Sequence, residues 1–501
     1  MFKKIFKVGI ATIFSRILGY IRDMLIAYHF GCSIYTDSFF VAFRIPNLLR
    51  QLLGEGTLSS SFIPVFTHKM EKEGIERARI TANYVFYLVL ILTGVLVLIG
   101  EIFTPSIVKI IAPGFLLNRE KFILTVKLTR IMFPIMCFIS LAAVVFGISN
   151  SLKYFFLPAI SPSMMNLSII IFFLLISGKM SQPVYGVAFA VVVGIFLEFL
   201  LPLFIPIKKK ILSFRFLTNP INMIKDEGVL KIISLMLPAT VGIAVYQFNA
   251  LVDTVCASIL EEGSVSALYY SLRLTHLPLA LFGISVATVS LPYLSQRVAR
   301  DEKKGYFDTI EEGFYFTFLF ILPATIGIIY LSNDIVKVLF GRGEFDEKAI
   351  LLTGGVLRFY ASGLIFFSGT RLLVTSFYAL KDTKTPVKTA TFSLFVNIFL
   401  NIILMFPLKA KGLALATSIS SFFNFVYLFM LFRLKTGYAI TNELIYKVLK
   451  IICCSLILFL FLYYSPFKSL NIYLKVFFDI LVGFLVYIIS CYFLGVLPVK
   501  S

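Results

Sequence analysis

The sequence predicts an all-α integral membrane protein with about 14 transmembrane helices. Of its 501 residues, 59% are apolar and only 14% are charged, whereas soluble domains are about half apolar and a quarter charged. The mean hydropathy is +0.94, and apolar runs recur along the whole chain. Because so little polar surface is available to face water, we expect lipid to surround most of the molecule.

Each predicted span is a run of about twenty apolar residues, which is the length of helix that crosses a bilayer. The second span is the weakest by hydropathy, because it carries Asp37, Arg44, Arg50 and Glu55. The fourteen ranges are 5–28, 36–56, 80–106, 122–147, 157–178, 183–206, 230–259, 264–294, 308–331, 349–378, 387–406, 412–434, 445–465 and 472–496.

The basic residues that give the chain its net charge of +20 are distributed unequally between the two sides of the expected topology. Alternate loops, counted from the N-terminal tail, hold 26 basic residues, and the opposite loops hold 11, Lys121 among them. The positive-inside rule therefore places both termini in the cytoplasm. Most of the positive charge is explained in this way, so we expect no nucleic-acid partner.

The chain contains an internal repeat, in which matching residues are separated by a nearly constant spacing along the sequence. Spans 1–6 and 7–12 are therefore expected to form two lobes, and six spans per lobe give both the same orientation. Such parallel repeats enclose a central cavity in transporters. We expect an N-lobe at 1–215, a C-lobe at 216–440 and two additional helices at 441–501. The matched pairs are Asp23 and Asp253, Arg44 and Arg273, Pro64 and Pro292, Lys153 and Lys381, and Pro158 and Pro386.

Nine basic residues lie inside the predicted spans, where each arginine costs about 2.5–3.5 kcal/mol on insertion scales. Arg16, Arg22, Arg44 and Arg50 occupy the first two spans, with few acidic residues nearby. Arginine remains charged and matches phosphate oxygens with paired donors. The cluster therefore predicts an anionic substrate, such as a lipid-linked diphosphate, a nucleotide or an acidic sugar. Snorkelling or structural ion pairing is the favoured interpretation for Lys127, Arg130, Arg358 and Arg371, and the alternative for the arginines of the first two spans.

A second polar set comprises Asp253, Asn397, Asn401 and Thr417. The two asparagines are four residues apart, so they share one helix face. Oxygen ligands around one carboxylate could hold Na⁺. A plain interhelical hydrogen-bond network is the alternative interpretation.

Several motifs resemble the MurJ/MviN lipid II flippases of the multidrug/oligosaccharidyl-lipid/polysaccharide exporter superfamily. The resemblance covers nearly the whole chain, and the motifs of the first two spans are its most specific part. The matching segments are SRILGYIRD at 15–23, TDSFFVAFRIPNLLR at 36–50, EG at 55–56, FIP at 62–64, APGF at 112–115, YYSLRL at 269–274 and KTPVK at 384–388.

The resemblance implies that cavity arginines bind the substrate, with Asp23 and Asp37 as acidic companions. It assigns the possible Na⁺ site to Asp253, Asn397, Asn401 and Thr417. Leu272 stands before Arg273 where relatives often carry an acidic residue. Asn401 stands where some relatives carry Asp, so cation binding is expected to be weaker or absent. The arginines implied are Arg16, Arg22, Arg44, Arg50 and Arg273.

The function implied is that of a lipid II flippase and not of an enzyme. Lipid II, the undecaprenyl-diphosphate-linked peptidoglycan precursor, would move from the cytoplasmic to the outer leaflet by alternating access. The implied setting is the bacterial inner membrane, with membrane lipids as neighbours and the chain as a monomer. No cofactor is required apart from possible Na⁺, and the apolar run at 451–464 would accept the polyprenyl tail.

Three other functions fit parts of the pattern. A flippase for another polyprenyl-diphosphate-linked oligosaccharide would share the fold, but should lack the motifs of the first two spans. A cation-driven drug exporter would have an acidic cavity. A membrane enzyme acting on polyprenyl phosphates would show clustered carboxylates, and the sequence has no Walker, GxSxG or HExxH motif.

Overall fold

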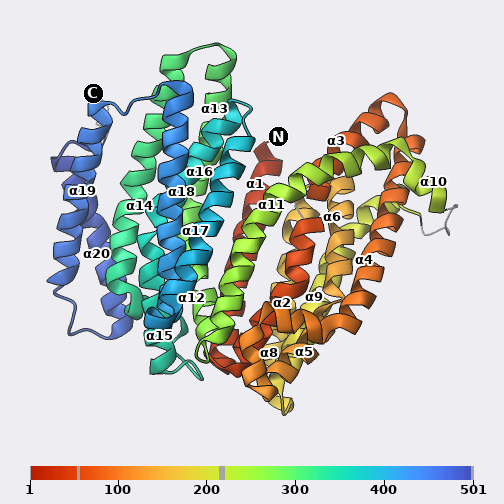
Figure 1. Cartoon of the computed structure of the whole chain (residues 1–501), viewed down its shortest axis with the longest axis horizontal. Coiled ribbons are helices and arrows are strands. Elements are labelled where there is room, and N and C mark those ends of the chain that lie inside the picture. Colours follow the sequence, from red (N-terminus) through yellow and green to blue (C-terminus); the bar gives the residue numbers. More distant parts are fainter. Residues whose placement is uncertain (1, 54–56, 214–219, 498–501) are drawn as a thin grey trace. The chain divides into compact units, whose positions relative to one another are not determined.

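The computed structural model describes residues 2–53, 57–213 and 220–497, and these residues form helices and connecting turns without a strand. Figure 1 shows the helices in chain order. The first group is α1 (Phe2–Phe30), α2 (Ile34–Leu53), α3 (Thr57–Lys72), α4 (Ile75–Ile111), η1 (Pro113–Leu117), α5 (Arg119–Met132), α6 (Ile135–Ser151), α7 (Phe156–Ile160), α8 (Ser163–Leu175), η2 (Ser177–Lys179), α9 (Pro183–Lys208), α10 (Pro220–Lys225) and α11 (Glu227–Ile259). The second group is α12 (Ser264–Pro278), η3 (Leu279–Ile284), α13 (Ser285–Ala299), α14 (Lys303–Phe340), α15 (Glu347–Ser362), α16 (Leu364–Ala379), α17 (Lys384–Leu408), α18 (Ala410–Thr436), α19 (Asn442–Tyr463) and α20 (Ile472–Phe493).

Within the described residues, each of the fourteen predicted ranges overlaps one helix or consecutive helices, so the all-α membrane fold is confirmed. The count of 14 spans is not confirmed: 8 helices of the described chain are long and apolar enough to cross a membrane, or 9 if the bent pair α15–α16 is one span. Helix α3 was not predicted, because its sequence mixes polar residues with a proline. Phe133-Pro134 separates α5 from α6, and Gly363 separates α15 from α16.

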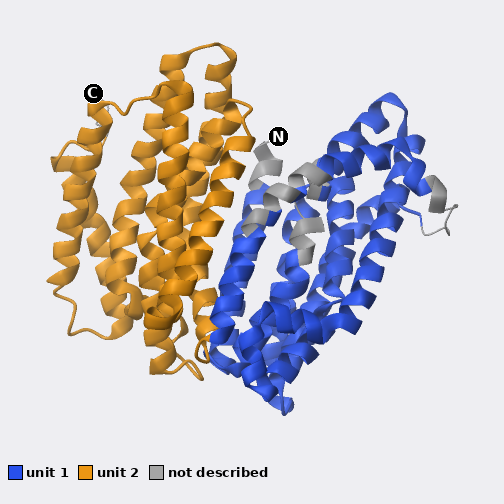
Figure 2. Ribbon diagram, in the orientation of Figure 1, with its two compact units in different colours: residues 1–259 blue, residues 260–501 orange. Residues whose placement is uncertain are grey.

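The chain forms two compact units, residues 1–259 and 260–501, coloured separately in Figure 2. Helix α11 belongs to the first unit, where it packs against α2, α3, α4 and η1. The lobe boundaries expected from the sequence repeat, near residues 215 and 440, stay a prediction.

Backbone geometry repeats between the units at positions that the sequence repeat pairs. Leu152 ends α6 with φ −80° and ψ 6°, and Leu380 ends α16 with φ −79° and ψ 6°. Each is followed by a lysine with positive φ, 65° at Lys153 and 59° at Lys381. A positive φ is uncommon for any residue but glycine. Two lysines in this conformation at paired positions of the repeat therefore support a duplicated fold.

Helix caps show the same correspondence. The side chain of Asn118 accepts a hydrogen bond from the backbone N of Lys121 at the start of α5. The number of residues between Asn118 and Asp346 equals the number between Lys153 and Lys381, so the repeat pairs these two caps. Asp346 accepts a hydrogen bond from the backbone N of Ala349 at the start of α15. Both side chains satisfy a backbone donor that the first helical turn leaves free.

The last two helices, α19 and α20, are built into the core of the second unit. The Tyr487 hydroxyl donates to the Leu319 carbonyl of α14 at 2.6 Å. Lys475 pairs with Asp334 of α14 at 2.5 Å. Buried Leu458 and Cys491 belong to the same apolar cluster as the α14 side chains. These contacts attach the C-terminal pair to α14.

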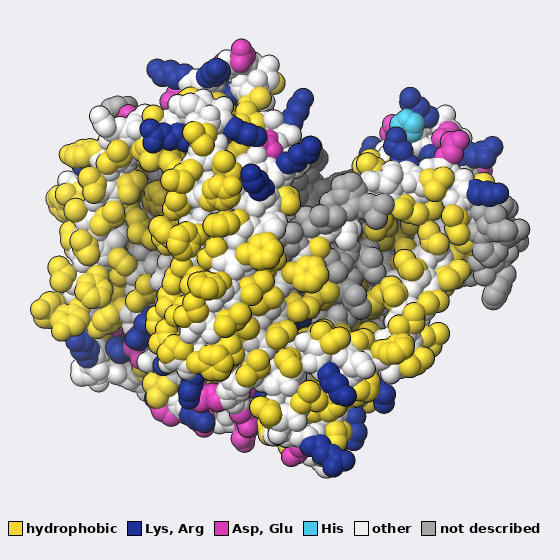
Figure 3. Space-filling model, viewed as in Figure 1, with side chains coloured by type: hydrophobic (Ala, Val, Ile, Leu, Met, Phe, Trp, Pro, Cys, Tyr) yellow, Lys and Arg dark blue, Asp and Glu magenta, His cyan; other side chains and the backbone are white. Residues whose placement is uncertain are grey.

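Large apolar side chains are exposed along the helices, as expected for surfaces that face lipid. On α17, for example, Phe395, Phe399 and Phe406 are each exposed by more than half. Figure 3 shows hydrophobic side chains over the flanks of the helices, with Lys, Arg, Asp and Glu gathered toward the helix ends. This distribution is that of a membrane-spanning protein.

Asp382 caps α17 in the turn that precedes the KTPVK motif. Its Oδ1 accepts from the backbone N of Lys384 and of Thr385, both at 3.0 Å. Its Oδ2 accepts from the Thr385 hydroxyl at 2.6 Å and from Lys435 of α18. Burial by itself raises the pKa of this carboxyl, but the hydrogen bonds from Lys435 and Thr385 prevail and hold the pKa at about 2.

We expect Asp382→Asn to lower the stability of the protein by about 1 kcal/mol at pH 7, because the amide can still cap the helix but loses the charge that pairs with Lys435. The pKa of Asp382 is depressed in the folded state, so its ionised form stabilises the fold fully above the unfolded pKa of about 3.9. That contribution is lost as the pH falls from about 4 toward 2. Thermal unfolding of both proteins between pH 7 and pH 3 measures it. A difference in Tm that stays constant across this range would contradict the account.

Candidate functional site

Arg22 forms a buried polar centre in the first unit. Its side chain is 6% exposed, although its helix lies among apolar residues. The guanidinium donates to Asp23 Oδ1 from Nη2 at 2.6 Å and from Nε at 3.0 Å. It also donates from Nη1 to Asn166 Oδ1 on α8 at 2.9 Å. A buried arginine needs such partners because its charge is costly in an apolar setting.

Asn166 fixes this centre to the backbone of α1. Its Nδ2 donates to the carbonyl of Ser15 at 3.2 Å, while its Oδ1 accepts from Arg22. Asn166 was not predicted as part of the site, because a lone asparagine in an apolar run carries no spacing signal. Helices α1 and α8 pack together, so the amide joins them through both of its polar ends.

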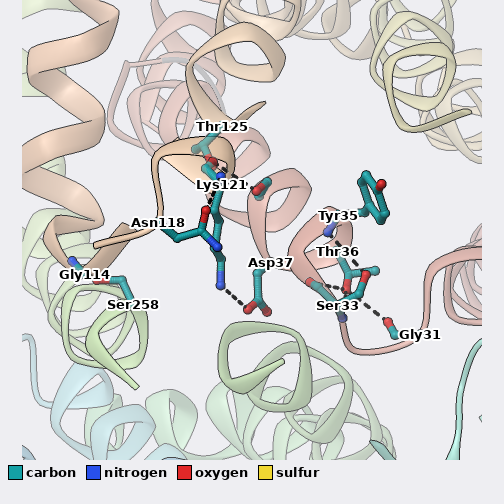
Figure 4. A network of polar contacts seen from close by, with 11 residues as sticks. Gly31, Ser33, Tyr35, Thr36, Asp37, Gly114, Asn118, Lys121, Thr125 and Ser258 are labelled. Carbon is teal, nitrogen blue, oxygen red and sulfur yellow. Dashed lines mark hydrogen bonds and ion pairs between the residues drawn. The ribbon is translucent and has the colours of Figure 1, made fainter. Parts of the chain in front are cut away.

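Asp37 and Lys121 form a second buried pair, shown in Figure 4. Asp37 lies in the first turn of α2 and Lys121 in the first turn of α5. Lys121 Nζ lies 2.7 Å from Asp37 Oδ2 and 4.2 Å from the centre of the Phe115 ring. Lys121 was not predicted as a partner of Asp37. The role of Asp37 as an acidic companion of the arginines stays a prediction. The assignment of Lys121 to a loop is wrong: it is 7% exposed inside a helix.

The APGF motif at 112–115 brings η1 against the end of α11. The backbone N of Gly114 donates to the Ser258 hydroxyl at 3.1 Å (Figure 4). A Cβ at position 114 would lie 2.1 Å from the Ser258 carbonyl oxygen. Only glycine permits this approach, so the motif has a structural role here.

Arg44 joins α2 to α11 in the same unit. Its Nη1 donates to the Ala250 carbonyl at 2.7 Å and to the Thr254 hydroxyl. The side chain is half-buried, and both of these acceptors are neutral. Arg44 therefore contacts the part of α11 that also carries Asp253.

The other predicted arginines lie in different surroundings. Arg16 is exposed on α1. Arg273 is exposed on α12 and stacks on Tyr269, its guanidinium carbon 5.4 Å from the ring centre. Its Nη2 also donates to the Tyr269 hydroxyl at 3.2 Å. The side chain of Arg50 lies outside the described residues. The role of all these arginines in substrate binding stays a prediction.

Three members of the possible cation set come together in the second unit. Asn401 Nδ2 donates to Asn397 Oδ1 at 2.9 Å, and Asn397 Nδ2 donates to the Thr417 hydroxyl at 3.3 Å. Both asparagines are fully buried. Asp253, the fourth member, lies on α11 in the first unit. The contacts among the three are those of the hydrogen-bond network that the sequence left open as the alternative.

The arrangement of the helices matches that of a solved membrane transporter. A multidrug resistance transporter of the MATE family, from the MOP superfamily, was solved in an inward-facing conformation. It aligns with a TM-score of 0.72 at 14% identity, over 87% of this chain and 98% of its own. At that identity the likeness shows the fold alone.

Sequence comparison is more specific. The family described as lipid II flippase MurJ matches residues 26–483. A probable lipid II flippase MurJ of Buchnera aphidicola from Schizaphis graminum is 32% identical over 99% of this chain and 97% of its own length. A second probable lipid II flippase MurJ, from Buchnera aphidicola of Acyrthosiphon pisum, is 36% identical over 85% of this chain and 83% of its own length. A solved lipid II flippase MurJ in an inward closed conformation has a TM-score of 0.82 at 32% identity, covering 97% and 98%. The chain belongs to the MurJ lipid II flippase family.

Proposed function

We propose that this protein is a lipid II flippase of the bacterial inner membrane, a transporter and not an enzyme. The observation that carries the proposal is the full-length similarity to proteins named lipid II flippase MurJ. The buried and half-buried arginines of α1 and α2 support it, because a diphosphate requires cationic partners that stay charged away from water. The product of such transport is the precursor of peptidoglycan on the outer face of the membrane.

The proposed mechanism is alternating access. Arg22 and Arg273, with Arg16, Arg44 and Arg50, would bind the diphosphate while the polyprenyl tail stays in lipid beside the helices of 441–501. An anion moving outward is favoured by an inside-negative potential, by about 2.3 kcal/mol per charge and 100 mV. The pairing of Arg22 with Asp23 and Asn166 supports a two-state role, because these partners could release the guanidinium when substrate arrives. Cytoplasmic termini and a monomeric state are part of the proposal.

The substrate is best tested by titrating the purified protein with lipid II and with a lipid-linked O-antigen repeat, followed by native mass spectrometry. We expect lipid II to bind at least about tenfold more tightly, a difference of about 1.4 kcal/mol. Equal or tighter binding of the O-antigen lipid would favour the alternative, a flippase for another polyprenyl-diphosphate-linked oligosaccharide.

We propose a weak Na⁺ site at Asp253, Asn397, Asn401 and Thr417. Hydrogen bonds already join three of these side chains, so Na⁺ must compete with them. We expect the Tm to rise by about 2 °C between 0 and 300 mM NaCl at constant ionic strength, as for a ligand with a Kd of about 100 mM. The rise should vanish in Asn397→Ala. An unchanged Tm in the unsubstituted protein would leave only the hydrogen-bond network.

A further inference from the structure

We propose that the first unit carries a binding site for the headgroup phosphate of an anionic phospholipid. The site is a pocket of about 550 Å³ between the start of α1, the turn from α6 to α7 and the end of α9. Four lysines line it, together with aromatic side chains that include Phe155 and Phe204. The lysines are Lys7, Lys153, Lys208 and Lys209. The arginines of the proposed transport site do not line this pocket.

The segments that form the pocket carry an excess of positive charge. Residues 1–22 contain no Asp or Glu. In the sequence from 121 to 225, Glu198 is the only acidic residue. Within the described ranges, no carboxylate forms an ion pair with Lys7, Lys208 or Lys209, and all three lysines are exposed. Cations concentrated in one concave site attract an anion more strongly than the same cations spread over a surface.

The walls of the pocket distinguish a lipid from a free anion. Phe204 is 61% exposed, and the Lys208 ammonium lies 5.4 Å from the centre of its ring. Tyr154 and Phe156 are also exposed at the pocket. Free phosphate gains nothing from aromatic walls, whereas the glycerol and the first methylenes of a phospholipid bury apolar area against them. Exposed aromatic rings beside lysine ammonium groups therefore fit a phospholipid better than a free phosphate ion.

The turn that carries Lys153 is held in a fixed conformation. Lys153 has a φ of 65°, and its backbone N donates to Asn150 O at 2.9 Å. The backbone N of Tyr154 donates to Ser149 O, also at 2.9 Å. Because the candidate membrane spans Arg119–Ser151 and Pro183–Lys208 both end at this pocket, we place the turn at the membrane interface. At that level lysines attract anionic lipid headgroups.

The experiment counts the lipids bound to the full-length protein by native mass spectrometry during titration with phosphatidylglycerol, phosphatidylcholine or inorganic phosphate. The variants are the double substitution Lys208→Gln with Lys209→Gln, and Phe204→Ala. The matched control is Lys303→Gln with Lys304→Gln, two exposed lysines at the start of α14. Circular dichroism and Tm of each variant confirm that it folds.

We expect the double variant at 208 and 209 to bind phosphatidylglycerol about tenfold more weakly, with phosphatidylcholine unaffected. Phe204→Ala should weaken the binding of phosphatidylglycerol about threefold, and the affinity of the control should stay within about twofold of that of the parent. Three results would overturn the proposal: an equal loss in the control, an unchanged affinity in the double variant, or full displacement of the lipid by inorganic phosphate at millimolar concentration. Displacement by equimolar undecaprenyl diphosphate would assign the pocket to a different lipid and also overturn it. None of these results depends on whether the protein transports lipid II.

Discussion

Replacing Arg22 with alanine is expected to abolish the ability of the protein to support growth of a strain that lacks its lipid II flippase. The substitution removes the charge that would bind the diphosphate. It also removes three hydrogen bonds, two to Asp23 and one to Asn166. Removing one partner of a buried ion pair commonly costs about 3–5 kcal/mol of stability. Loss of growth alone would therefore not distinguish a defect in substrate binding from a defect in folding.

The double variant Arg22→Gln with Asp23→Asn makes that separation. It removes both charges together and keeps side chains able to form hydrogen bonds, so membrane expression and Tm should return close to those of the parent. If Arg22 binds substrate, growth should still fail. Restored growth in the double variant would show that Arg22 has only a structural role. Arg79→Ala, which removes a partly exposed arginine paired with Glu76, is the matched control and should grow normally.

Gly114→Ala is expected to destabilise the first unit strongly. The added Cβ would lie 2.1 Å from the Ser258 carbonyl oxygen and 2.4 Å from its carbon, so η1 and α11 must separate. The bond from Gly114 N to the Ser258 hydroxyl would be lost with that shift. Overpacking of this kind costs about 1–3 kcal/mol, and the neighbouring pair of Lys121 and Asp37 is also expected to be displaced. Thermal unfolding should show a Tm lower by about 3–8 °C.

Gly94→Ala is the control for that measurement, because a Cβ there meets no atom within 4 Å. Alanine is also the better helix former, so the Tm of this variant should be equal to or higher than that of the parent. An equal Tm for Gly114→Ala and the parent would contradict the close approach of η1 to α11.

The helices could be predicted from the sequence because lipid imposes long apolar runs. Within the part of the chain that the structure describes, every predicted range overlaps helical residues. The sequence repeat reappears in the backbone angles of Lys153 and Lys381. Helix α3 escaped prediction, because it has the composition of a polar loop and is stabilised by packing against α4, α6 and α11. The grouping of α11 with the first unit is also absent from the sequence pattern, since hydropathy does not specify which neighbour a helix contacts.

The candidate site was predictable in its charged residues, including Asp23 beside Arg22, but not in the partners that other helices supply. Arginines inside apolar runs are conspicuous, and Arg22 was found in that way. Its partner Asn166 lies far away along the chain and has no sequence signal. Lys121 was misplaced because it follows the polar residues 118–120, and only the fold shows that Asp37 neutralises it. Pairing across distant segments depends on tertiary packing, which one sequence does not reveal.

Transport of lipid II by the purified protein tests the central claim most directly. The full-length chain would be reconstituted into liposomes that contain fluorescent lipid II, and the fraction of headgroups accessible to an impermeant quencher or enzyme would be followed over time. The account predicts that the protein accelerates the movement of lipid II between leaflets, and that Arg273→Ala removes the acceleration while reconstituting equally well. Movement no faster than in empty liposomes, or equal movement of an uncharged polyprenyl glycolipid, would contradict it.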